Sequence, residues 1–90
     1  MTWRVEFSLD AEKQFAKLDR PVQRRIAGFL RSRIATDENP RRLGDALEGT
    51  LSDFWRYRVG DYRLLCRIED KRVVVVVVHI AHRSKAYRKR

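Results

Sequence analysis

Six consecutive valines, Val73 to Val78, constrain the fold of this 90-residue chain more than any other feature. Valine is β-branched and favours strands, and the run is apolar on both faces of any strand that it forms. Such a strand is stable when both of its faces are buried, since an exposed edge of this kind promotes aggregation. The run therefore predicts an inner strand over residues 73–80, and it is far shorter than the roughly 20 residues that span a membrane.

The stretch before the valines predicts two more strands joined by a tight turn. The letters FWRYRV alternate between apolar and polar residues, and Gly60-Asp61 is a candidate two-residue turn. This turn sets a register in which the opposed pairs are Trp55 and Cys66, Tyr57 and Leu64, Arg58 and Arg63, and Val59 and Tyr62. The apolar members share one face, and the other face carries Phe54, Arg56, Arg58, Arg63, Leu65 and Arg67. A second turn at Asp70-Lys71 leads into the valine strand and sets His79 opposite Tyr62, as a buried histidine on the core face.

The first half of the chain predicts a strand and a helical hairpin. TWRVEFS alternates like a half-buried strand, which we expect to cover the free side of the valine strand. Residues 9–36 then predict two helices, with Ser8 or Asp10 capping the first and Pro21 opening the second. The second helix carries an apolar stripe of Val22, Ile26, Phe29, Leu30 and Ile34, opposite a face with Arg24, Arg25, Arg31 and Arg33. RRLGDALEG is a linker with room for one helical turn.

These elements predict one α+β domain over residues 1–90. The order is an N-terminal strand, a helical hairpin and a three-stranded antiparallel meander, with the helices packed on one face of the sheet. A chain of this length buries one modest core, and its composition of 43% hydrophobic residues supports a packed fold.

The charge of the chain indicates a polyanionic partner. The formal net charge is +9, and a field of this size attracts RNA or DNA over a long range. Cys66 is the one cysteine, so no internal disulfide forms and we expect a cytoplasmic location. Charged residues near the start, Arg4 and Glu6, argue against a signal peptide. His79, His82 and Cys66 match no zinc spacing, so we expect no metal and no cofactor.

A set of cations with one phenol remains as the candidate site. Arginine is planar, permanently charged and bidentate toward phosphate. Several arginines around one phosphodiester could stabilise the charge that develops during phosphoryl transfer, and the 2′-hydroxyl of RNA could serve as the nucleophile. An aromatic ring could stack on an unpaired base. The same arginines could equally form a binding surface without catalysis.

Three stretches together resemble the RelE superfamily, the toxins of bacterial and archaeal toxin–antitoxin pairs. They are WRYRVGDYRLLCRIED, the valine strand with the HRSKAY that follows it, and the opening VEFSLDAEKQFAKLD. The resemblance covers essentially the whole chain, and its most specific parts are the Gly-Asp-Tyr-Arg turn and the terminal His-Arg-x-x-x-Tyr. It implies two helices packed on one face of an antiparallel sheet. It also implies metal-independent cleavage of messenger RNA in the ribosomal A site, leaving a 2′,3′-cyclic phosphate.

The resemblance also implies roles for particular residues. The functional basic residues and the C-terminal tyrosine of the family correspond to Arg56, Arg63, Arg83 and Tyr87, and Arg58 matches a further basic position. Phe54 stands where the best-known branch has a lysine implicated in catalysis. Other branches use a carboxylate and a histidine, which correspond to Asp45 and His82. The expected catalytic set is Arg56, Arg63, Arg83, Tyr87 and His82, and the expected RNA-binding set is Arg58, Arg67, Lys85 and Arg88.

Two alternatives of other classes stay open. ParE-type relatives share the fold but poison DNA gyrase by binding and hydrolyse nothing, and they usually lack the terminal arginine–tyrosine arrangement. The other alternative is a simple RNA-binding module. The nuclease interpretation implies the ribosome and mRNA as partners. It also implies a cognate antitoxin in a hetero-oligomeric complex, and no membrane.

Overall fold

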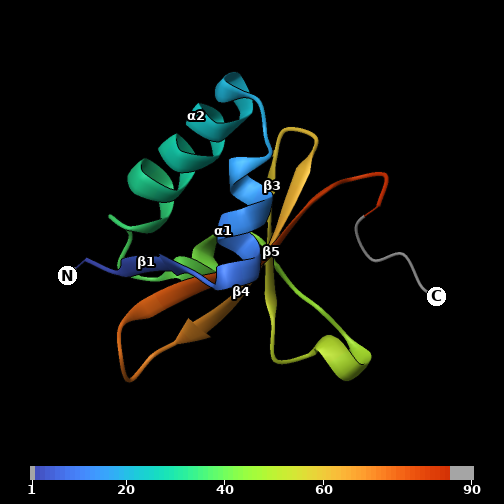
Figure 1. Ribbon diagram of the computed structural model, residues 1–90. Helices are drawn as coiled ribbons and strands as arrows, with labels where there is room; N and C mark the ends of the chain where they lie inside the picture. The colour runs from blue at the N-terminus through green and yellow to red at the C-terminus, as the bar shows by residue number, and fades with distance from the viewer. Residues whose placement is uncertain (1, 86–90) are drawn as a thin grey trace.

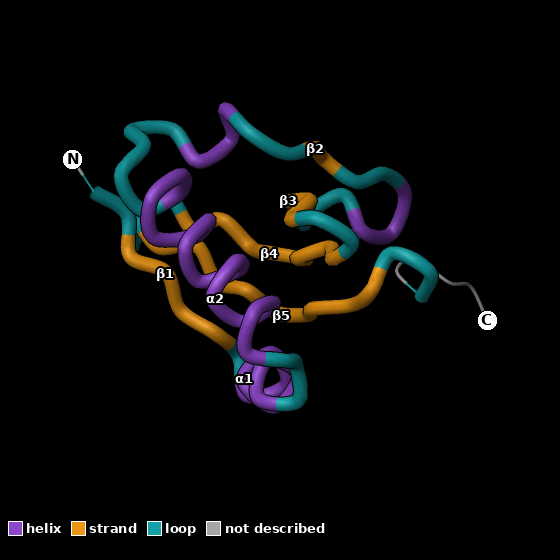
Figure 2. Tube along the Cα trace, turned by 90° about the horizontal axis from the view of Figure 1, so that it is seen from above, coloured by secondary structure: helices purple, strands orange, loops and turns teal. Residues whose placement is uncertain are grey.

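The valine strand lies inside a five-stranded mixed sheet. The computed structural model (Figure 1) describes residues 2–85, and the strand order is β1-β5-β4-β3-β2. The strands are β1 (Arg4–Phe7), β2 (Asp45–Ala46), β3 (Trp55–Val59), β4 (Tyr62–Glu69) and β5 (Val74–His82). β1 pairs with β5 in parallel and the other pairs are antiparallel. The prediction that the N-terminal strand covers the free side of the valine strand is therefore confirmed (Figure 2).

The hairpin of β3 and β4 has the predicted register. Trp55 lies opposite Cys66, Tyr57 opposite Leu64, Arg58 opposite Arg63, and Val59 opposite Tyr62. Gly60 adopts a left-handed backbone with φ of 58°, which a two-residue hairpin turn of this kind requires. Tyr57, Val59, Leu64 and Cys66 are all buried, so the predicted core face is also confirmed.

The hairpin of β4 and β5 differs from the prediction. Glu69 pairs with Val74, so the loop between the strands is 70–73 rather than Asp70-Lys71 alone. Val73 lies in this loop with φ of 55°, an unusual conformation for a β-branched residue, and the strand begins one residue later.

A β-bulge further changes which residues of β5 face the core. Leu65 pairs with His79 while Cys66 pairs with Val77, so Val78 is the extra residue. Because side chains alternate along a strand, the extra residue moves His79 off the core face and brings Ile80 onto it. His79 is exposed, and its Nδ1 lies 3.0 Å from Nε2 of Gln14. The prediction of a buried His79 opposite Tyr62 is wrong, and His82 takes that position.

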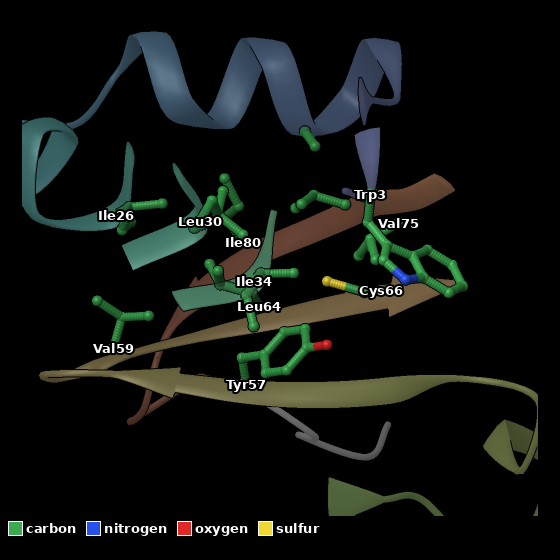
Figure 3. Close-up of a cluster of buried hydrophobic side chains, with 12 residues drawn as sticks. Trp3, Ile26, Leu30, Ile34, Tyr57, Val59, Leu64, Cys66, Val75 and Ile80 are labelled. Atoms are coloured by element: carbon green, nitrogen blue, oxygen red, sulfur yellow. The ribbon is translucent and has the colours of Figure 1, made fainter. Parts of the chain in front are cut away.

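Two helices pack against the sheet and complete one core. The first is α1 (Leu9–Ala16), capped by Ser8, whose Oγ accepts from the backbone N–H of Ala11. The second is α2 (Arg20–Phe29), with Pro21 in its first turn, and it continues as a π-helix over Leu30–Ile34. Ala11 of α1 and the buried stripe of α2 join the strands in a single cluster of side chains (Figure 3). The predicted α+β class is confirmed. Within residues 2–85 no helix is long and apolar enough to cross a membrane.

The segment between the helices and β3 contains more structure than one helical turn. It holds two short 3₁₀ helices, Pro40–Arg42 and Gly49–Leu51, and the two-residue strand β2 between them. Gly44 has φ of 82°, and a Cβ there would clash with the carbonyl oxygen of Arg56. This close approach lets β2 pair with β3, which places Asp45 opposite Arg56.

Candidate nucleic-acid interface

The face of the sheet opposite the core carries the predicted arginines of β3 and β4. Arg58 is exposed and lies directly opposite the half-buried Arg63. Two like charges in this arrangement repel each other, which destabilises the bare sheet. Nη1 of Arg63 donates to the carbonyl oxygens of Gly60 at 3.2 Å and of Tyr62 at 3.1 Å. The guanidinium of Arg63 is therefore held at the turn between the two strands.

Arg83 is fixed to the same turn from the other side of β4. Its backbone N–H donates to the carbonyl oxygen of Asp61 at 2.7 Å, and its Nε lies 3.7 Å from Oδ1 of Asp61. The side chain of Arg83 is 64% exposed, so it is anchored through its backbone and free to contact a ligand. The Gly-Asp pattern marks Asp61 only as a turn residue, and this contact could not be predicted because it depends on β5 extending to His82.

His82 ends β5 beside Tyr62. The two rings meet edge to face, with centroids 5.4 Å apart. Nδ1 of His82 accepts from the backbone N–H of Ser84 at 3.2 Å, and Oγ of Ser84 lies 3.0 Å from the same nitrogen. Because a backbone N–H can only donate, Nδ1 carries a lone pair here and the ring proton lies on Nε2. Lys85 follows in the turn after the strand and is exposed.

Arg56 lies two residues before Arg58 on β3 and forms an ion pair with a carboxylate. Its Nη2 is 2.8 Å from Oδ2 of Asp45, and its side chain is 19% exposed. The hydrogen bond from Arg56 holds the pKa of Asp45 below its ordinary value, which makes Asp45 a weaker proton acceptor. Asp45 on β2 is also three strand spacings, about 14 Å, from the strand of His82. The two residues that correspond to the alternative acid–base pair are therefore not brought together.

Arg67 lies away from the other predicted cations. It is four residues beyond Arg63 on β4, which is about 13 Å along an extended strand. There its Nη2 is 3.5 Å from Oε2 of Glu69. Arg72 joins the same group, with Nη1 2.7 Å from Glu69 and Nη2 3.4 Å from Glu6. Arg67 thus belongs to a network of ion pairs at the opposite end of β4 from the Gly60-Asp61 turn.

This network predicts that the free energy of unfolding falls in acid. Hydrogen bonds from Arg4 and Arg72 lower the pKa values of Glu6 and Glu69, respectively, below the ordinary 4.5. A carboxylate with a lowered folded-state pKa stabilises the fold above its unfolded-state pKa and stops doing so as the pH falls through the folded-state value. We expect the midpoint of urea unfolding to decrease from pH 7 to pH 3.

The control for this pH dependence is Glu69→Gln, in which the midpoint of urea unfolding should change less between pH 7 and pH 3. Added salt should also reduce the change in the unfolding midpoint between pH 7 and pH 3, because the ion pairs are exposed and therefore screened. An unfolding midpoint that is constant or rises toward pH 3 would contradict the stabilising role of the ion pairs of Glu6 and Glu69.

Two predicted residues, Tyr87 and Arg88, lie outside the described residues, and their roles stay predictions. Cys66 is fully buried, and burial raises the pKa of its thiol, as expected for a packing residue. Within residues 2–85 no three histidine, cysteine or carboxylate side chains form a group that could hold a metal ion. Arg63 and Arg83 are thus the predicted cations that contact the Gly60-Asp61 turn, and Arg58 lies opposite Arg63 on β3.

Comparison with known proteins supports a single family. Residues 5–87 match the family model for the ParE toxin of the type II toxin–antitoxin system. Toxin RelG of Mycobacterium tuberculosis is 30% identical over 89 residues, which cover 99% of this chain and 100% of that protein.

Two solved structures are similar over nearly the full length of the chain. A chain of a RelBE toxin–antitoxin complex from Mycobacterium tuberculosis has a TM-score of 0.84 with 28% identity, covering 94% of this chain and 95% of that one. A chain of the archaeal RelE–RelB complex from Pyrococcus horikoshii has a TM-score of 0.74 with 30% identity, covering 96% and 100%. The chain belongs to the RelE/ParE superfamily, the toxins of type II toxin–antitoxin systems.

Proposed function

We propose that the chain is a ribosome-dependent endoribonuclease that cleaves mRNA in the ribosomal A site and so inhibits translation. The observation that carries the proposal is the convergence of Arg63 and Arg83 on one turn, with Arg58 opposite Arg63. Guanidinium groups that meet at one end of a sheet suit a phosphodiester, because each can donate two parallel hydrogen bonds to phosphate oxygens. The similarity to toxin RelG supports the same conclusion.

The proposed reaction uses the RNA itself as the nucleophile. The 2′-hydroxyl attacks the adjacent phosphorus, the bond to the 5′-oxygen of the next nucleotide breaks, and a 2′,3′-cyclic phosphate remains. Arg63 and Arg83 stabilise the negative charge that grows on the non-bridging oxygens. Nδ1 of His82 contacts Ser84, so Nε2 carries the ring proton and donates a hydrogen bond to the leaving 5′-oxygen, which stabilises its developing charge. Solvent takes the proton that the 2′-hydroxyl loses and supplies the one that the leaving 5′-oxygen gains. Tyr87 stacks on the neighbouring base.

The test is single-turnover cleavage on ribosomes programmed with a defined mRNA. We expect one cut in the A-site codon, a 2′,3′-cyclic phosphate at the new end, and no loss of rate with a chelator. Naked RNA should be cut much more slowly, because the ribosome supplies the orientation of the 2′-hydroxyl. Equally fast cleavage of naked RNA at the same protein concentration would show that the ribosome is not required.

The second candidate is poisoning of DNA gyrase, which the match to the ParE toxin family favours. Expression of the chain in cells separates the two candidates. The nuclease leaves new transcript ends within codons, whereas a gyrase poison causes DNA damage and leaves transcripts intact. DNA damage without new transcript ends would replace the nuclease proposal.

We further propose that a cognate antitoxin neutralises the toxin in a hetero-oligomeric complex, as the relatives seen in toxin–antitoxin complexes suggest. A chain of net charge +9 suits an inhibitor segment that is acidic, partly apolar and disordered until it binds. We expect it to cover the arginines of the outer face or to displace the tail from residue 82 onward. Hydrogen exchange of the complex should show protection there. Inhibition without protection at either place would contradict this mode of binding.

A further inference from the structure

A third arginine contacts the turn that anchors Arg63 and Arg83. Arg25 of α2 is exposed, and its guanidinium lies against the backbone of Gly60. A Cβ at Gly60 would be 2.5 Å from Nη1 of Arg25 and 3.4 Å from its Cζ, so the contact depends on the missing side chain of the glycine. The turn therefore has arginines from α2, from β4 and from the end of β5.

The charges around the turn are poorly balanced. Asp61 is the acidic residue of the turn, and it lies 3.7 Å from Nε of Arg83 with 66% of its side chain exposed. Within residues 2–85 no carboxylate forms an ion pair with Arg25 or Arg63. Guanidinium groups that share one two-residue turn repel one another, and an anion bound among them would relieve the repulsion.

We propose that the Gly60-Asp61 turn binds RNA through two neighbouring phosphates, and that Arg25 contacts the phosphate next to the scissile one. Arg63 belongs to the outer face of the sheet, whereas Arg25 comes from a helix that packs on the core face. An RNA strand that crosses the turn passes from Arg63 and Arg83 to Arg25. Arg25 thus binds the substrate, whereas Arg63 and Arg83 act in the chemical step. This inference rests on the proposed nuclease function, to which it adds a substrate-binding residue.

The decisive comparison is between Arg25→Ala and Arg24→Ala. Both variants lose one exposed arginine from neighbouring positions of α2, so their net charges are equal, but the side chain of residue 24 points about 100° away around the helix. The probe is a single-stranded RNA with a 2′-deoxy nucleotide at the cleavage position, which can bind but cannot be cut. Binding is measured at several salt concentrations.

We expect Arg25→Ala to bind this RNA about tenfold more weakly, as for the loss of one charge-assisted contact. The slope of log affinity against log salt should fall in magnitude by about 0.7, the value for one phosphate of a single strand. Arg25→Lys should keep the slope, because it keeps the charge. Arg24→Ala should change neither quantity. On programmed ribosomes, Arg25→Ala should raise the concentration for half-maximal cleavage and leave the rate at saturation within about twofold.

The phosphate could belong to the messenger or to ribosomal RNA, and binding to vacant ribosomes separates these sources. Weaker binding of Arg25→Ala to vacant ribosomes, with unchanged affinity for the oligonucleotide, would assign the contact to ribosomal RNA. It would overturn the proposal that Arg25 contacts the messenger phosphate next to the scissile one. Equal affinities of Arg25→Ala and Arg24→Ala for the oligonucleotide and for vacant ribosomes would show that Arg25 does not form a phosphate-binding site. If the wild-type chain binds RNA through Arg25 but cuts no mRNA on ribosomes, the nuclease proposal fails and the binding site stands.

Discussion

Replacing Arg83 by alanine is expected to lower the rate of single-turnover mRNA cleavage on programmed ribosomes by about 150-fold or more. That factor corresponds to about 3 kcal/mol of transition-state stabilisation, the usual effect of removing one preorganised donor to a developing oxyanion. The backbone of Arg83 is anchored to Asp61, so the guanidinium starts from a fixed point and needs little reorganisation to contact a phosphate. The rate constant at saturating ribosome concentration is the quantity to measure.

The stability of this variant should be nearly unchanged. The side chain of Arg83 is 64% exposed and its one ion pair, at 3.7 Å from Asp61, is at the surface, where such pairs contribute little. Arg31→Ala is a matched control, because it removes the same charge from an exposed position in the π-helix that follows α2. Tyr87→Phe should retain more activity than Tyr87→Ala if stacking dominates. Full toxicity of a folded Arg83→Ala, Tyr87→Ala double variant would exclude the tail from the mechanism and favour gyrase poisoning.

The register of β3 and β4 could be predicted because two independent signals agree. A Gly-Asp turn fixes which residues lie opposite each other, and the alternation on both sides of that turn puts the apolar side chains on one face. The placement of the valine strand could be predicted from its composition. A strand that is apolar on both faces promotes aggregation at the edge of a sheet, so it is expected inside the sheet with a paired strand on each side. These inferences use only local spacing and burial.

The bulge at Val78 could not be predicted in the same way. A bulge changes the alternation of a strand, but in a run of six valines every position is identical, so the sequence contains no mark of where the alternation shifts. The consequence appears only after the run ends, where His79 lies off the core face and His82 lies opposite Tyr62. The role of His82 near the candidate site therefore depends on a feature that only the structure shows.

The partners of the arginines were also beyond prediction. Periodicity places Arg56 and Arg67 on the same face, but it does not say which carboxylate each one meets. The pair of Arg56 with Asp45 requires β2, a strand of two residues in a segment with no strand pattern. The contact of Arg25 with Gly60 joins a helix to a hairpin turn 35 positions later in the chain, and helical periodicity marks Arg25 only as a polar-face residue.

Replacing Leu64 by alanine is expected to lower the free energy of unfolding by about 2–5 kcal/mol, the range for a buried leucine in a well-packed core. Leu64 is the third residue of β4 and is fully buried between Tyr57 of β3 and Ile80 of β5. Urea unfolding followed by tryptophan fluorescence should show a lower midpoint with an unchanged slope. The neighbouring Leu65 is the matched control, because Leu65→Ala is the same chemical change on the outer face, where the side chain is half-buried. It should lower the midpoint much less.

The two leucine variants also separate loss of fold from loss of chemistry. A domain of this size has about 5–15 kcal/mol of total stability, so Leu64→Ala should leave a measurable unfolded fraction at growth temperature and weaken toxicity in cells. Its cleavage rate per folded molecule should be close to that of the wild type, because Arg63 and Arg83 are held by backbone contacts of the turn rather than by Leu64. Arg83→Ala should show the reverse pattern, with normal unfolding and slow cleavage. Equal midpoints for Leu64→Ala and Leu65→Ala would mean that the two faces of β4 are equally packed, which would contradict the core on which the geometry of the site depends.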